Sequence, residues 1–89
     1  MSGLALVRLV GNLGSSSDGR KVSSEKIQTP TLLREVIAAI EGKHNLILRR
    51  DSMLVLVNGV EANALDDLET MIQADDELVF IPMFHGGSN

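Results

Sequence analysis

Hydrophobic and polar residues along the first third of the chain predict two strands joined by a loop. Residues 4–10 form a short apolar run, broken by Arg8, that ends at Gly11-Asn12 and predicts a first strand. Residues 21–27 alternate loosely between polar and apolar side chains and predict a second, edge-like strand antiparallel to the first. The Gly- and Ser-rich segment 11–20 between them predicts a mobile hairpin loop.

The next segment carries the periodicity of an amphipathic helix. Its apolar residues recur at the spacing i, i+3, i+4 and i+7, which places them on one stripe of a helix over residues 31–41. These residues are Leu33, Val36, Ile37 and Ile40. Thr29 is predicted to cap the helix, with Pro30 in the first turn. Gly42 is predicted to end it with a positive φ.

The second half of the chain predicts a hairpin, a connector and a final strand. Residues 53–57 are continuously apolar, and Asn58-Gly59 separates them from residues 60–62, which is a strong hairpin signal. Residues 65–72 predict a turn or short helix, and residues 77–81 predict a last strand that ends at Pro82. The order predicts an α+β fold, with a mixed four- to five-stranded sheet and one main helix across one face.

A single helix covers only one face of a sheet, so some apolar strand residues should be exposed. An exposed apolar patch on a small domain usually marks a partner surface. The candidates for this surface lie on the strands of the second half or directly after the last one: Leu54, Leu56, Val55, Val57, Phe80 and Met83. The alternative is a core in which loops cover the second face.

Composition and charge exclude several classes of function. The net charge of −4 disfavours nucleic-acid binding, and the absence of cysteine excludes disulfides, thiolate metal sites and a cysteine nucleophile. The acidic pairs 66–67 and 75–76 are typical of solvated turns, so we expect no metal site. Neither His44 nor His85 has the spacing of a serine–histidine or metal-ligand motif, so we expect no enzymatic activity. The run 4–10 is too short to span a membrane, and the N-terminus lacks the pattern of a signal peptide. We therefore expect a soluble, cytoplasmic protein.

The last residues form a thin tail after the final strand. The chain ends Met83-Phe84-His85-Gly86-Gly87-Ser88-Asn89, and two glycines near a terminus give a conformationally free backbone. We expect a domain over residues 1–84 and a flexible tail over residues 85–89.

The strand order, the segment Asp75 to Pro82 and the tail Phe84-His85-Gly86-Gly87 together resemble ubiquitin-like β-grasp proteins. The resemblance is to the ubiquitin-related modifier, the molybdopterin-synthase small subunit and the thiamine sulfur carrier. It implies a β-grasp fold and activation by a partner enzyme that uses ATP to adenylate the terminal glycine carboxylate. By match of motif, Gly87 is the activated residue and Gly86 its spacer, and the chain binds no cofactor of its own.

The chain departs from this pattern at its end, because Ser88-Asn89 follow the second glycine. Activation then requires a processing peptidase that cuts between Gly87 and Ser88. The activated glycine would pass to a lysine of a target protein, or become a thiocarboxylate that serves a sulfur-acceptor enzyme, and the sequence does not separate these two. The alternative is a non-covalent interaction domain with an inert tail.

Overall fold

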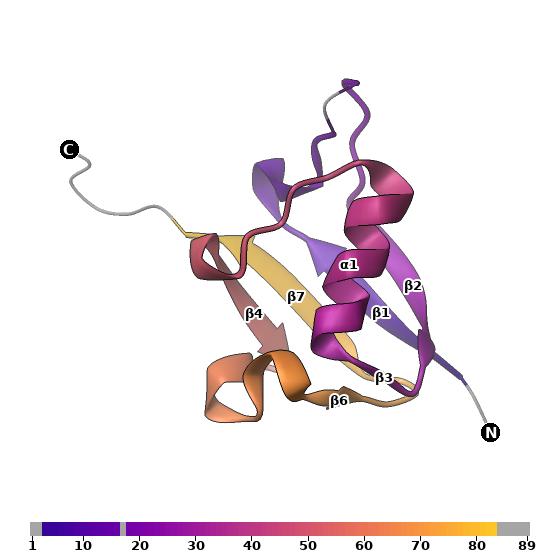
Figure 1. The fold of residues 1–89 in the computed structure, drawn as a ribbon, viewed down its shortest axis with the longest axis vertical. Helices are drawn as coiled ribbons and strands as arrows, with labels where there is room; N and C mark the ends of the chain where they lie inside the picture. Colours follow the sequence, from indigo (N-terminus) through magenta and orange to yellow (C-terminus); the bar gives the residue numbers. More distant parts are fainter. Residues whose placement is uncertain (1–2, 17, 84–89) are drawn as a thin grey trace.

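Strands from the two ends of the chain lie side by side in the middle of the sheet. The computed structural model of the protein describes residues 3–16 and 18–83. Strand β1 (Gly3–Leu9) runs parallel to β7 (Glu77–Pro82), with Leu6 opposite Glu77 and Leu9 opposite Phe80. This parallel pair needs a long crossover, and the rest of the chain supplies it (Figure 1).

Three further strands complete a mixed five-stranded sheet in the order β2-β1-β7-β4-β5. Strand β2 (Ser24–Thr29) pairs antiparallel with β1, β4 (Met53–Val57) with β7, and β5 (Val60–Glu61) with β4. A second, two-stranded sheet joins β3 (Thr31–Leu32) to β6 (Met71–Ile72). The predicted mixed sheet is therefore confirmed.

Helix α1 (Leu33–His44) lies across one face of the main sheet (Figure 1). Its predicted apolar stripe is confirmed, since Leu33, Val36 and Ile40 are fully buried and Ile37 is 7% exposed. These side chains pack against the inward-facing residues of the sheet, which include Val7, Val55, Leu78 and Phe80. Removal of this apolar surface from water is the main stabilising contribution to the fold.

Both predicted ends of the helix are wrong. Thr29 belongs to β2, where it pairs with Gly3, and Pro30 precedes the helix. The first turn is instead closed by Glu35, whose carboxylate accepts hydrogen bonds from the Leu32 amide at 3.4 Å and the Thr31 hydroxyl at 3.1 Å. The helix also continues through Gly42 to His44, and the residue with a positive φ is Asn45, which caps the helix at 56°.

Four short 3₁₀ helices connect the strands among the described residues: η1 (Gly11–Gly14), η2 (Arg50–Ser52), η3 (Ala62–Ala64) and η4 (Asp67–Glu69). The predicted connector over 65–72 contains η4 and β6. The predicted hairpin turn is confirmed, with positive φ at both Asn58 and Gly59. None of the helices in the described part of the chain is long and apolar enough to cross a membrane.

Candidate functional site

The base of the C-terminal tail is held between two loops at the end of strand β7. On one side the Met83 amide donates to the Ser52 carbonyl at 3.0 Å, and Pro82 lies opposite Met53. On the other side the Val10 amide donates to the Phe80 carbonyl at 2.9 Å, and a side chain at Gly11 would contact the ring of Pro82. Strand β7 is central in the sheet, so the chain leaves the domain from a point fixed on both sides.

The residues predicted to carry the chemistry follow this point. Gly86, Gly87 and Ser88 lie outside the described residues, as does the predicted flexible tail 85–89. The last described residue, Met83, is 42% exposed.

The sheet face opposite α1 carries a band of partly exposed apolar side chains. We call this band the outer face patch; it consists of Leu54 and Leu56 on β4, Val79 and Ile81 on β7, and Leu4 and Leu6 on β1. Leu54 lies opposite Ile81, and Leu56 lies opposite Val79, so four of these side chains form one cluster next to the base of the tail. Leu4 is the most exposed, at 47%.

Half of the predicted partner surface is wrong. Val55 and Phe80 are fully buried and Val57 is 6% exposed, because these residues alternate with the outer ones and point toward α1. Leu54 and Leu56 are half-buried on the outer face, and Met83 is exposed.

The prediction also missed Leu4 and Leu6 as members of the outer face patch. The signal was in the sequence, since Arg8 must point to solvent and Leu4 and Leu6 share its face of β1. In the same way, Glu77 faces solvent on β7, so Val79 and Ile81, which share its face, are expected on the outer face. Arg8 lies diagonally across from Glu77 on the neighbouring strand, and its Nε donates to Glu77 Oε2 at 2.7 Å.

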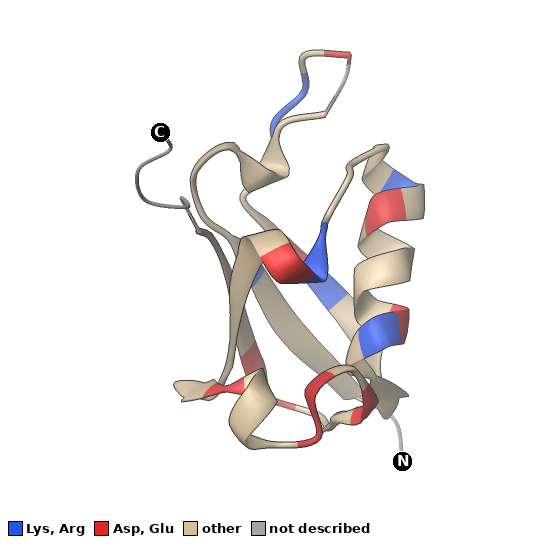
Figure 2. Cartoon of the chain, turned by 60° about the vertical axis from the view of Figure 1, so that its left-hand side comes forward, with Lys and Arg blue, Asp and Glu red and all other residues tan. Residues whose placement is uncertain are grey.

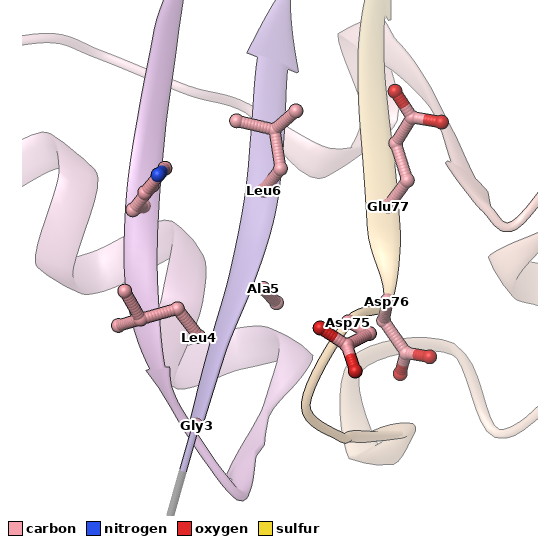
Figure 3. A pocket seen from close by; sticks show the side chains of 8 residues that line it. Gly3, Leu4, Ala5, Leu6, Asp75, Asp76 and Glu77 are labelled. Carbon is pink, nitrogen blue, oxygen red and sulfur yellow. The ribbon is translucent and has the colours of Figure 1, made fainter.

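A groove of about 670 Å³ lies at the other end of the outer face, along β1 and the turn before β7 (Figure 3). Its polar lining consists of Lys26, Asp75, Asp76 and Glu77. Asp76 accepts hydrogen bonds from the Asn58 side chain at 2.9 Å and the Gln73 amide at 2.7 Å, while Glu77 pairs with Arg8. Two of the three carboxylates are thus engaged in holding turns and strands together.

Acidic residues gather at the lower end of the molecule in the view of Figure 2. Seven of the twelve carboxylate side chains fall between Glu61 and Glu77 in the sequence. Within residues 3–16 and 18–83, no three His, Asp or Glu side chains are grouped so that they could hold a metal ion. The features of the described residues that remain as candidates are the outer face patch and the end of β7.

The layout of one helix on a mixed sheet, with a central last strand that leads into the tail, is that of a ubiquitin-like β-grasp fold. The model of the ThiS family matches residues 7–87 of the chain. The chain belongs to the ThiS family. Its β-grasp fold agrees with this membership. The family match ends at Gly87 and leaves Ser88 and Asn89 outside.

Solved structures of other proteins share the fold of this ThiS family member. Small archaeal modifier protein 1 from Methanosarcina acetivorans is 21% identical with a TM-score of 0.73, covering 98% of this chain and 99% of that one. The same-named protein from Haloferax volcanii is 23% identical with a TM-score of 0.68, covering 96% and 100%. Urm1 from Trypanosoma brucei is 20% identical with a TM-score of 0.68, covering 97% of each chain. A comparison with curated protein sequences finds no match.

Proposed function

We propose that the protein is a carrier or modifier whose Gly87 carboxylate is adenylated by a partner enzyme after Ser88 and Asn89 are removed. The chain supplies the tail and a docking surface, and the partner enzyme binds ATP and provides the catalytic groups. The observation that carries the proposal is the match to the ThiS family up to Gly87, on a fold whose central last strand leads directly into that tail.

The proposed chemistry needs a free carboxylate at the end of the chain. A carboxylate oxygen of Gly87 attacks the α-phosphorus of ATP, pyrophosphate leaves, and an acyl-adenylate forms. AMP is then a good leaving group, so a sulfur or amine nucleophile can displace it from the glycine carbonyl. While Ser88 is attached, the carbonyl of Gly87 is part of an amide and no such oxygen is present.

The outer face patch is the proposed docking surface for the activating enzyme. Its cluster of Leu54, Leu56, Val79 and Ile81 adjoins the base of the tail, so one partner can contact both. Contiguous apolar side chains exposed on a small domain favour a protein partner, because their burial stabilises the complex. Met83, exposed at the start of the tail, extends the same apolar surface.

The test is mass spectrometry of the protein purified from the cells that make it. We expect a product that ends at Gly87. The full-length and trimmed forms are then incubated with extract and ATP, and only the trimmed form should yield an adenylate. Gly86→Val in the trimmed form should prevent adenylation without unfolding the domain, because a β-branched side chain restricts the backbone and widens the tail.

The products distinguish the two fates of the adenylate. A thiocarboxylate at Gly87 assigns sulfur transfer, and a Gly87 remnant on lysines of other proteins assigns conjugation. The presence of modifiers among the structures of the same fold supports conjugation, and the ThiS family match supports sulfur transfer. A protein found only with Ser88 and Asn89 intact, and never adenylated, would overturn the proposal and favour a non-covalent interaction domain.

A further inference from the structure

The groove along β1 carries a positive charge on one side and a negative charge on the other. Lys26 lines it from β2, and Asp75 lines it from the turn before β7. Leu4 and Leu6 of β1 lie between these two sides and supply the apolar part of the lining (Figure 3). The groove is therefore polarised across its width.

The strand register fixes how these side chains are spaced. Lys26 lies directly opposite Leu6, and the Asp75 amide donates to the Leu4 carbonyl at 2.8 Å. Strand β1 separates β2 from β7, and neighbouring strands are about 4.8 Å apart, so the two sides of the groove are about 10 Å apart at the backbone. The two charges are thus held on opposite sides of the leucines.

Both charges are available to an occupant of the groove. Lys26 and Asp75 are exposed, and neither side chain makes an ion pair or a hydrogen bond with another of the described residues. The other two carboxylates of the groove are engaged, since Asp76 holds the turn and Glu77 pairs with Arg8. The groove therefore offers one unpaired cation and one unpaired anion.

A second copy of this chain has the features that the groove requires. An occupant needs a carboxylate against Lys26, a cation against Asp75 and apolar side chains between them. The groove itself presents these features in the same arrangement. A two-fold axis that passes between Leu4 and Leu6 would place Lys26 of each copy against Asp75 of the other, with the leucines packed around the axis.

The strength of such a pairing follows from the number and exposure of its contacts. Two exposed ion pairs contribute little each, so burial of the four leucines supplies most of the stabilisation. The net charge of −4 opposes pairing only weakly, because charges more than about 8 Å apart are screened at physiological salt. We expect a dissociation constant of about 0.1–1 mM.

We propose that two copies of this chain pair face to face through the β1 groove, with Lys26 of each copy against Asp75 of the other. The dimer covers Leu4 and Leu6 of the outer face patch, so it competes with a partner enzyme that docks over the whole patch. This consequence rests on the proposed function. The pairing itself is tested without ATP or an activating enzyme, so its failure and the failure of the proposed function are distinguishable.

Sedimentation of the full-length protein between about 10 µM and 1 mM measures the pairing. The dimer fraction should rise with concentration, and the amide NMR signals of Leu4, Leu6 and Lys26 should shift with it. Lys26→Glu should weaken the dimer by about tenfold or more, because it turns two attractive contacts into repulsive ones. Arg49→Glu makes the same charge change at an exposed residue outside the groove, so it is the matched control and should dimerise like the wild type.

Two variants that do not pair with themselves should pair with each other. Asp75→Lys alone should be as weak a dimer as Lys26→Glu, since it brings two lysines together at each contact. An equimolar mixture of the two variants restores opposite charges at both contacts, so the mixed dimer should form as well as the wild-type dimer. Asp75 has a φ of 69°, which asparagine tolerates, so Asp75→Asn is a second variant and should weaken the dimer by about threefold.

Three results would overturn the proposal. The first is a wild-type protein that stays monomeric at about 1 mM, which would leave the groove to a different protein or to solvent. The second is a dimer that Lys26→Glu and Arg49→Glu weaken equally, or whose signal changes lie outside the groove. The third is a mixture of Lys26→Glu and Asp75→Lys that stays monomeric although both variants keep the wild-type melting temperature.

Discussion

The carboxylate of Glu25 joins the edge strand to the last turn of the helix. Its oxygens lie 2.6 Å from Lys43 Nζ and 2.8 Å from His44 Nε2, and its side chain is only 13% exposed. The hydrogen bond from Lys43 lowers the pKa of Glu25; burial opposes this, and His44 lowers the pKa further. The ionised form is therefore favoured by folding.

This arrangement predicts a pH dependence of stability. A carboxyl group whose pKa is lower in the folded state stabilises the fold above its unfolded pKa, and this stabilisation is lost as the pH falls through the folded pKa. Glu25→Gln should cost about 1 kcal/mol near pH 7, since Lys43 is largely exposed and solvent weakens the pair. By urea unfolding, the difference from wild type should shrink below about pH 4. A difference that stays constant with pH would contradict the role of the charge.

A single charged residue on a strand shows which of its apolar side chains face solvent, so strands with such a residue could be assigned from sequence. Arg8 and Glu77 set the facing of β1 and β7, so their outward apolar neighbours could be assigned from sequence. Strand β4 is apolar throughout and carries no such marker, so Val55 and Leu54 could not be told apart. Their facing follows from pairing with β7, which is a long-range contact that no local pattern encodes.

At the scale of elements, the interior of the helix was predictable and its ends were not. The apolar spacing of α1 depends only on helical geometry and the covered face. Its start depends on β3 and β6, because the Leu33 amide donates to the Thr70 carbonyl at 2.9 Å, far along the chain. The helix continues past Gly42, where an added side chain would have open space, and ends at His44 with Asn45 as its cap.

Replacing either of two glycines in different elements with alanine should therefore change the stability of the protein in opposite directions. Gly42 is inside α1, and a methyl group added there would meet no atom within 4 Å, so Gly42→Ala should stabilise the protein by about 0.5–1 kcal/mol. Gly59 has a φ of 83° in the β4–β5 turn, so Gly59→Ala should destabilise it by about 1–2 kcal/mol. Urea unfolding of both variants measures the effects, and a loss of stability in Gly42→Ala would place the helix end before residue 42.

At the scale of the whole molecule, the layout was predictable from the order of the elements. A hairpin, a helix, a second hairpin and a final strand can form one helix-covered sheet in only a few topologies. The parallel pairing of β1 with β7 follows from that topology and places the final strand in the centre. A central strand is held on both sides, so the end of β7 is fixed up to Met83, the last described residue.

That geometry makes the two faces of β4 separable by experiment. Leu54→Asp on the outer face patch should raise the concentration of trimmed protein needed for half-maximal adenylation in extract by about tenfold or more, because it places a charge in the proposed interface. Its melting temperature should change much less than that of Val55→Asp, which buries a charge in the core and should unfold the domain. Ala39→Asp, an exposed position on α1 at the opposite face, is the matched control and should leave adenylation unchanged. Equal effects of Leu54→Asp and Ala39→Asp would exclude the outer face patch as the docking surface, even if Gly87 is still activated.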